Sequence, residues 1–332
     1  MEKDRIICEL LNGAVALIDD NKLDETYKAI SDVVSGHPEC VDERFSAELK
    51  LVMKSMEYRR ELKEFSFLRG LSLIYKYCEM NYRDAGIVDM VAEDAGAELP
   101  DKDVIWWSWL QGLENAPEVV RCCYDSVKKL GRKIIILDEN NISEYVSLPP
   151  YIEDKYQRGI ISRTHYTDLV RMELLTERGG TWIDATAWIS GTASICPVLE
   201  AEDLFMFRSG NVSEHIIFDS WFIQAKTKSV IFESTKRMLY AYWEKEDELK
   251  HYFLLHLMMT LACHMYPGEY ADIPLFSNEP AHVLQHDMFL PYSEKRWVQI
   301  MDMSDVHKLT YKYEKDDIGG SFLEHVLNEG AT

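Results

Sequence analysis

Residues 1–99 carry apolar side chains at a spacing typical of helices. Leu10, Leu11, Val15 and Ile18 recur at intervals close to one helical turn, which places them on one face of a helix. The segment 42–82 is long, charged and periodic in the same way. It shows no repeat of about thirty-four residues, so tetratricopeptide units are not indicated. We therefore predict a helical accessory region over residues 1–99.

At residue 100 the pattern of apolar positions changes. Val104–Trp107 is a short apolar and aromatic run bounded by polar residues, which favours a buried strand. A helix is expected from Pro117, because proline suits a first helical turn, to Leu130. The continuous apolar run 133–137 then predicts a strand of the kind found in parallel sheets. Strand, helix and strand in this order predict an α/β domain over residues 100–332.

A second helix and strand follow in the same domain. The pattern predicts a helix over 162–178, ended by Gly179-Gly180, where a left-handed cap is easily accommodated. The next strand covers Thr181–Asp184. Beyond it we expect short strands at 204–207 and 216–223, and helices at 230–243 and 246–266. The tail from 274 to 313 is expected to be irregular, with Asn278-Glu-Pro280 as a turn.

Composition narrows the class of protein. Fifty-seven acidic and thirty-six basic residues give a formal charge of −21, which repels nucleic acid backbones, so no nucleic-acid partner is expected. Seven scattered cysteines with no CxxC pair indicate free thiols in a reducing compartment. The amino terminus lacks the apolar core of a signal peptide, and the most apolar window, 252–266, is too short to span a bilayer. We expect a cytoplasmic protein, with any membrane contact peripheral and at the inner face.

The residues suited to chemistry gather around the predicted helix 162–178. Asp168 and Arg171 lie three apart and so share one helical face, where a carboxylate and a guanidinium could clamp the hydroxyls of a sugar. Asp184 ends the following strand, and ligands of α/β sheets collect outside the carboxyl ends of strands. Taken singly, the ion pair and the Gly-Gly turn each have an ordinary structural explanation. The helix pair, the Gly-Gly turn and the strand-terminal acid together favour a sugar-binding site.

The stretch 162–186 resembles the signature of glycosyltransferases that share a sugar-binding DxD region, including glycosyltransferase family 32. More closely, residues 103–313 resemble the bacterial capsular polysaccharide synthesis proteins. The likeness rests on a tryptophan-rich start, Ile105-Trp-Trp-Ser-Trp-Leu-Gln-Gly112, and on the run Gly-Gly-Thr-Trp-Ile-Asp-Ala-Thr186. The resemblance implies a GT-A-type, Rossmann-like fold that holds a nucleoside diphosphate sugar.

The resemblance also implies roles for single residues and for the whole chain. The residues implied in catalysis are Asp168, Arg171 and Asp184, and those implied in donor binding are Trp107, Trp109, Gln111, Gly179, Gly180, Thr186, Lys308 and Lys312. The implied activity is that of a hexosyltransferase acting on a UDP-sugar with retention of configuration. The implied acceptor is a growing capsular or cell-surface polysaccharide or a lipid-linked oligosaccharide.

One position departs from the family pattern. Thr186 stands where the second acid of the DxD motif is expected, so the motif reads Asp-Ala-Thr. The family usually binds Mn²⁺ or Mg²⁺, and hard cations prefer several carboxylate or carbonyl oxygens. With Asp184 as the first ligand, His307 is the residue expected to complete a metal site, although a hydrogen-bonded structural histidine is the competing interpretation.

Two other functions are compatible with the same residues. A degenerate transferase fold could bind a sugar nucleotide or polysaccharide and serve as an assembly partner, which the missing second acid favours. A nucleotidyltransferase would use a similar sheet but a glycine-rich first loop bearing lysine or arginine. The first loop here is Trp-Leu-Gln-Gly112, which argues against that class.

Overall fold

A computed structural model describes residues 70–88, 96–209, 214–313 and 318–329 of the chain. Apart from Gly70 they belong to one compact unit, Leu71–Thr332. Most of the predicted helical region 1–99 lies outside the described residues, and its accessory role stays a prediction.

The centre of this unit is a five-stranded sheet in the order β2-β1-β3-β6-β5. Its strands are β1 (Val104–Ser108), β2 (Lys133–Leu137), β3 (Gly180–Ile183), β5 (Leu204–Arg208) and β6 (Phe218–Ala225). The first three strands are parallel, β6 is antiparallel to β3, and β5 is antiparallel to β6, so β5 runs in the direction of the first three. The predicted α/β fold is confirmed, and the sheet is mixed because β6 enters it in the opposite direction to the other four strands.

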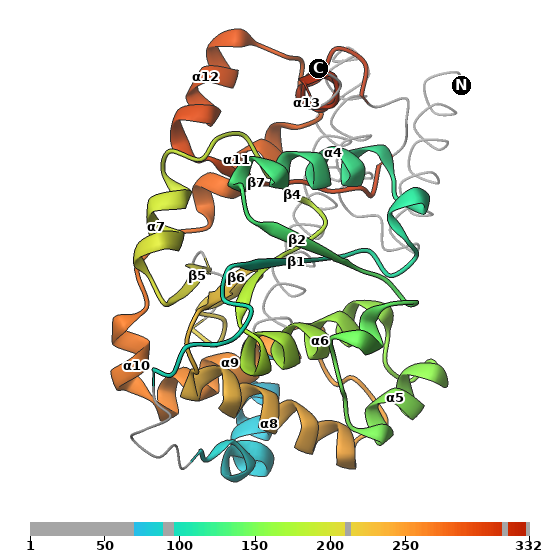
Figure 1. Cartoon of the computed structure of the whole chain (residues 1–332), viewed down its shortest axis with the longest axis vertical. Coiled ribbons are helices and arrows are strands. Elements are labelled where there is room, and N and C mark those ends of the chain that lie inside the picture. The colour runs from blue at the N-terminus through green and yellow to red at the C-terminus, as the bar shows by residue number, and fades with distance from the viewer. Residues whose placement is uncertain (1–69, 89–95, 210–213, 314–317, 330–332) are drawn as a thin grey trace, which may run out of the picture. The chain divides into compact units, whose positions relative to one another are not determined.

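Helices surround the sheet and connect its strands (Figure 1). Their bounds are α4 (Glu118–Val127), α5 (Pro150–Gln157), α6 (Arg163–Glu177), α7 (Ile195–Ala201), α8 (Val230–Lys245), α9 (Leu254–Met265), α10 (Pro267–Asp272), α11 (Glu279–Asp287), α12 (Glu294–Met303) and α13 (Phe322–Glu329). Short 3-10 turns are η2 (Arg83–Gly86), η3 (Leu113–Asn115), η4 (Lys128–Leu130) and η5 (Ile142–Glu144). A separate two-stranded sheet pairs β4 (Ala187–Ile189) with β7 (Val306–Lys308).

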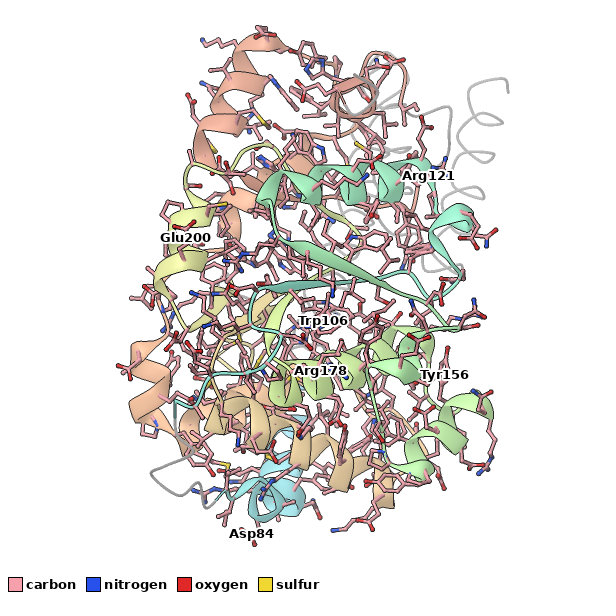
Figure 2. All side chains as sticks on the ribbon, in the orientation of Figure 1. Asp84, Trp106, Arg121, Tyr156, Arg178 and Glu200 are labelled. Atoms are coloured by element: carbon pink, nitrogen blue, oxygen red, sulfur yellow. The ribbon has the colours of Figure 1, made fainter. Side chains whose placement is uncertain are left out.

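Both faces of the central sheet are buried, because successive side chains of a strand point to opposite faces. Trp106 and Trp182 pack with α6, α8 and α9 in one apolar cluster. Trp107 and Ile183, their neighbours in sequence, pack with α4, α11 and α13 in the other. Figure 2 shows side chains filling the space between the sheet and the helices on each of its faces, and it labels Trp106 on the sheet. Two buried faces explain why the strands read as continuous apolar runs.

The helix of residues 70–82 packs into the first of these clusters. Cys78 and Tyr82 are buried there, and the Tyr82 ring lies 5.4 Å from that of Tyr242 on α8. This helix therefore contributes to the core of the unit that contains the sheet.

Gly179 and Gly180 allow β3 to begin close to its neighbours. Their φ angles are +73° and +100°, a region that side chains disfavour. A Cβ on Gly180 would lie 2.5 Å from the carbonyl oxygen of Val104. The Trp106 indole donates a hydrogen bond of 2.7 Å to the Gly179 carbonyl. The two glycines therefore hold β3 against β1 at the amino end of the strand.

The prediction of an irregular tail over 274–313 is wrong. That region contains α11, α12 and β7, and Pro280 lies in the first turn of α11, where its missing N–H costs nothing. The predicted helix 246–266 begins later, at Leu254. Pro280, which the sequence pattern placed in a turn, instead lies in the first turn of a helix. The turn assignment led to the prediction of irregular structure for the whole segment.

Candidate active site

Four charged side chains meet where β3 ends. Asp184 directly follows β3, and Asp168 and Arg171 come from consecutive turns of α6, which packs against that strand. Lys308 is the last residue of β7, which pairs Lys308 with Ala187 of β4. Two acids and two bases from three separate segments thus form one cluster.

Asp184 is the centre of this cluster. Its Oδ1 accepts hydrogen bonds from Arg171 Nη2 at 3.0 Å and from the Trp182 indole at 2.9 Å. Its Oδ2 accepts from Lys308 Nζ at 2.8 Å, and 28% of the side chain is exposed. Burial alone would raise the pKa of Asp184, but the positive charges of Lys308 and Arg171 outweigh it and lower this pKa below its ordinary value. Asp184 is therefore an anion at neutral pH.

Arg171 connects Asp184 to Asp168 and to the backbone carbonyl of Ser220. Its side chain is only 5% exposed, and it also donates to the Ser220 carbonyl and lies 3.5 Å from Asp168 Oδ1. The guanidinium stacks over the Trp182 ring at 4.7 Å. Among the described residues, its buried Nε has no hydrogen-bond partner. Such a buried charge needs both carboxylates beside it.

Asp168 is held in turn by a histidine. His165 Nδ1 lies 3.2 Å from Asp168 Oδ2, and His165 Nε2 accepts a 2.9 Å hydrogen bond from the Trp243 indole. Because the indole can only donate, Nε2 is the acceptor nitrogen and the proton of neutral His165 is on Nδ1. The chain Trp243–His165–Asp168–Arg171 therefore fixes the orientation of each member.

A second group of polar side chains approaches from β6 and α9. Asp219, near the start of β6, accepts from the Trp221 indole at 3.0 Å and from the Asn278 amide. His256, in the first turn of α9, interacts electrostatically with the carboxylates of Asp168, Asp184 and Asp219. Burial lowers the pKa of His256, and its Nδ1 is buried with no partner in the described part of the chain. This neutral imidazole is available to a ligand.

Two cavities adjoin the cluster and share Leu110 and Arg163 in their walls. The smaller, about 200 Å³, reaches Arg171 and Asp184 of the cluster and is lined by Ser108, Trp109, Leu110, Gln111, Arg163, Thr164, Thr167, Arg171, Trp182, Asp184, Ala185, Thr186 and Tyr311. The larger, about 800 Å³, lies beside the segment that follows β2 and the amino end of α6. Together they run along the carboxyl ends of three parallel strands, the usual place for a ligand of an α/β sheet.

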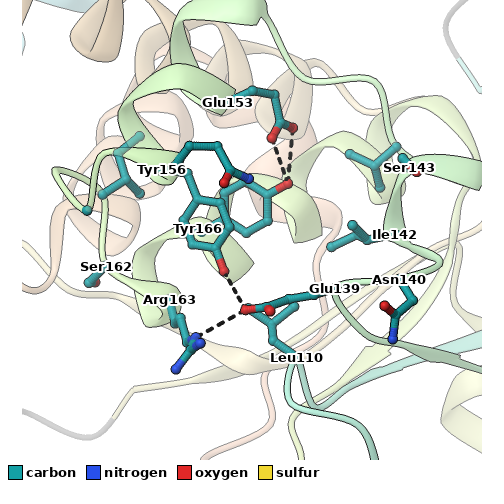
Figure 3. A pocket seen from close by; sticks show the side chains of 14 residues that line it. Leu110, Glu139, Asn140, Ile142, Ser143, Glu153, Tyr156, Ser162, Arg163 and Tyr166 are labelled. Carbon is teal, nitrogen blue, oxygen red and sulfur yellow. Dashed lines mark hydrogen bonds and ion pairs between the residues drawn. The ribbon is translucent and has the colours of Figure 1, made fainter.

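The larger cavity is walled by aromatic and polar side chains (Figure 3). Tyr156 and Tyr166 stack with ring centroids 3.8 Å apart. Glu139 accepts from Tyr156 at 3.1 Å and from Arg163 Nε at 3.2 Å, and Tyr166 donates to Glu153. Arg163 is the lining cation of this cavity, and it stands at the wall that both cavities share. The cavity suits a neutral polar group better than an anion.

The structure brings together most of the residues implicated by the sequence. Asp168, Arg171, Asp184 and Lys308 form the cluster, while Trp109, Gln111 and Thr186 line the smaller cavity.

Five other candidates lie elsewhere. Trp107 is buried in the core, and the two glycines occupy the opposite end of β3 from Asp184. Lys312 is exposed and outside the walls of both cavities. His307 is buried against Trp188, and its Nε2 lies 3.0 Å from Ser190 Oγ. Since it neighbours Lys308 on a strand, its side chain faces away from Asp184.

Other site residues were missed by sequence reasoning. Trp182 lies two positions before Asp184, and the period of a strand puts both on one face, so this contact was open to prediction. His165 shares the face of Asp168 for the same kind of reason. Ser220, His256 and Tyr311 come from distant segments, and no local pattern marks them.

The cluster offers a poor set of ligands for a resident divalent ion. Both carboxylate oxygens of Asp184 already accept hydrogen bonds, and two of the three donors are cationic side chains. Thr186 would add only a neutral hydroxyl, and the described ranges contain no group of three or more His, Cys, Asp or Glu side chains placed to hold a metal. An ion bound at Asp184 would have to displace Lys308 or stand beside it.

The mixed sheet, with helices on both faces and the charged cluster at the carboxyl edge of its parallel strands, defines an α/β fold. The model of the capsular polysaccharide synthesis protein family matches residues 60–326, and the chain belongs to that family. A search of curated proteins gave no match. No described helix is long and apolar enough to cross a membrane.

Solved structures with some similarity are those of glycosyltransferases. GlyE of Streptococcus pneumoniae TIGR4 is 13% identical with a TM-score of 0.38, over 69% of this chain and 60% of GlyE. Its apo form gives 11% identity and a TM-score of 0.35, over 69% and 62%. The PaToxG glycosyltransferase gives 12% and 0.37, over 81% of this chain and 98% of that one. This chain thus spans about 60% of GlyE, and none of these scores is high enough to transfer a substrate.

Proposed function

We propose that this protein transfers a sugar from a nucleoside diphosphate sugar, a UDP-sugar in the first instance, to a growing capsular or lipid-linked saccharide. The observation that carries the proposal is the cluster at the end of β3: one carboxylate, Asp184, held between the cations Arg171 and Lys308. A sugar diphosphate presents hydroxyl donors beside an anionic leaving group, and these residues complement both parts.

The difference between the two cavities supports one orientation of the donor. The transferred sugar would lie in the smaller cavity, with its hydroxyls on Asp184 and, at the edge of the cavity beside Arg171, on Asp168. The nucleoside would lie in the larger one, where neutral polar and aromatic side chains suit a base and a ribose. Arg163 at the shared wall would meet the diphosphate between them. The acceptor would then approach from the side of β6 and α9, where Asp219 and His256 lie.

Transfer would break the bond between the anomeric carbon and the phosphate oxygen, and the electron pair would leave with the nucleoside diphosphate. The acceptor oxygen would bond to the same carbon, and its proton would pass to the departing diphosphate. Both site carboxylates are engaged by cations, which makes them weak nucleophiles. This supports front-face substitution with retention over a covalent intermediate. Electrostatic stabilisation of the leaving group is commonly the largest contribution in such sites.

The test begins with a thermal-shift panel of UDP-, GDP-, dTDP- and CMP-sugars on the full chain. We expect stabilisation by one nucleotide class, followed by release of its nucleoside diphosphate when acceptor is added. NMR of the product then reports its anomeric configuration. Asp184→Asn should abolish release, whereas Asp302→Asn, which removes an exposed acid on α12, should not.

The assembly-partner hypothesis predicts a different result. Thr186 in place of a second acid favours it. Under that hypothesis a sugar nucleotide stabilises the chain, but the donor is neither hydrolysed nor transferred. No stabilisation by any sugar nucleotide would refute the transferase and an assembly partner that binds sugar nucleotides, and would leave only a partner that binds polysaccharide.

A further inference from the structure

The position of Lys308 has a consequence for how the leaving diphosphate is held. Lys308 is brought beside Asp184 by two backbone connections: β7 pairs it with Ala187, and the next amide, Leu309 N, donates to the Thr186 carbonyl at 2.8 Å. Its side chain is 16% exposed and its ammonium lies 5.4 Å from the centre of the Trp221 ring. The ammonium is therefore held in place by backbone pairing and packing.

This ammonium occupies a carboxylate oxygen that a divalent ion at Asp184 would use. An ion at this edge of the sheet needs carboxylate oxygens, and Asp184 is the acid that the Asp-Ala-Thr motif supplies. Lys308 Nζ already occupies Asp184 Oδ2 at 2.8 Å, and Arg171 occupies Oδ1. Thr186 stands where a second acid is expected, and a lysine binds the acid that remains. These two independent observations have one explanation.

We propose that Lys308 takes the place of the divalent ion in this enzyme, so that the donor is bound and the sugar transferred without a metal. The inference rests on the proposed function, since it concerns how the same site holds the leaving diphosphate. A lysine ammonium has three N–H donors. One stays on Asp184, and two are left for diphosphate oxygens that face the cluster.

In this proposal, cationic side chains rather than a metal ion stabilise the negative charge that develops on the leaving diphosphate. When the bond between the anomeric carbon and the phosphate oxygen breaks, the negative charge that develops on the diphosphate falls next to Lys308 and within reach of Arg163. Lys308 remains protonated throughout and transfers no proton. Asp184 keeps the ammonium oriented, which is the part a carboxylate ligand would otherwise play toward an ion.

The experiment measures binding of UDP, GDP and dTDP to the full chain by calorimetry, in EDTA and with added Mn²⁺. We expect one of these nucleotides to bind equally well in both buffers. Lys308→Met keeps the length of the side chain and removes its charge. It should weaken that binding in EDTA by about tenfold to a hundredfold, the loss expected for a hydrogen bond to a charged group.

Two further variants make the result specific. Lys295→Met removes an exposed charge on α12 and should leave binding unchanged. Thr186→Asp combined with Lys308→Met restores the second acid and frees Asp184, so it should bind the nucleotide with Mn²⁺ and poorly in EDTA. If Lys308→Met does not fold, as judged by circular dichroism, the charge-conserving Lys308→Arg serves instead, and it should still bind in EDTA.

The outcomes separate this inference from the function on which it rests. Binding to the wild-type chain that requires Mn²⁺ would overturn the role of Lys308 and leave the transferase intact. Equal binding by Lys308→Met and Lys295→Met in EDTA would overturn it as well. If no nucleotide binds to the wild type in either buffer, the proposed donor itself is wrong.

Discussion

Asp168→Asn removes one charge from the cluster and nearly preserves the shape of the side chain. Asp168 now accepts from His165 Nδ1 at 3.2 Å and faces Arg171 at 3.5 Å, with 8% of the residue exposed. An amide has one acceptor oxygen. If that oxygen faces Arg171, its NH₂ group meets the Nδ1–H of His165, and the reverse orientation sets NH₂ against the guanidinium. Either way one donor meets another donor.

The size of the effect follows from these contacts. One unfavourable donor pair in a buried site should lower the free energy of unfolding by about 1–3 kcal/mol. Arg171 keeps Asp184 and the Ser220 carbonyl, so the site should still assemble. The variant also loses a charged acceptor for a sugar hydroxyl. That loss should slow transfer by roughly tenfold to a hundredfold, at about 1.4 kcal/mol for each factor of ten.

The assay is release of nucleoside diphosphate at saturating donor, with stability measured by urea denaturation of the same preparation. Trp243→Phe is the matched control, because it removes the indole that holds His165 and leaves the charge of Asp168 in place. The control should lose a similar amount of stability and keep most of its turnover. Near-wild-type turnover in Asp168→Asn, or an equal loss of turnover in the control, would refute the sugar-clamp role of Asp168.

Four further changes test other parts of the structure. Tyr82→Ala, which leaves a cavity against Tyr242, should cost roughly 3–5 kcal/mol in urea denaturation without altering turnover per folded molecule. Gly180→Ala places a methyl group 2.5 Å from the Val104 carbonyl at a positive φ and should lower the melting temperature, whereas Gly131→Ala, also at positive φ but in open space, should lower it less. His256→Leu replaces an imidazole whose buried Nδ1 has no hydrogen-bond partner among the described residues, so stability should hold while transfer falls by up to about tenfold. Burial lowers the pKa of His307 to about 4, so on acidification the unfolded chain binds a proton at this histidine before the folded chain does. Stability should therefore fall as the pH drops from about 6.5 towards 4. Denaturation measured at several pH values should show a smaller fall for His307→Gln.

Sequence reasoning succeeded where the site is built from neighbours in the chain. Asp168 and Arg171 are one helical turn apart, and Asp184 follows the strand that the same helix leads into. Helical and strand periods suffice to place such residues on one face. The parallel pairing of β1 with β2 was open to prediction as well, because a short helix joins them and both strands are apolar throughout.

Periodicity alone could not place residues that strand pairing brings together from distant segments; the resemblance named Lys308, but not which carboxylate it meets. Lys308 lies 124 residues after Asp184, and it reaches that carboxylate through β7, a strand of three residues. Such a strand is too short to show a period of two, and Pro280 before it favoured a turn. Choosing between His307 and Lys308 as the residue that faces Asp184 requires the register of β4 against β7. A shift of one residue would exchange the two side chains, so the adjacent pair in the sequence gave no means of deciding.

The same register explains how a strongly acidic chain would accept the anionic donor proposed above. The formal charge of −21 repels a nucleoside diphosphate at a distance, but salt screens that repulsion within roughly 8–10 Å. Close to β3 the two acids Asp168 and Asp184 are balanced by Arg171 and Lys308, and Arg163 adds a further cation at the shared wall of the cavities. Affinity for the donor must then come from these few short-range contacts rather than from the overall field. Because Asp184 orients both cations and a lysine ammonium has three N–H donors, N–H groups of Lys308 remain for the diphosphate although the cluster carries no net charge.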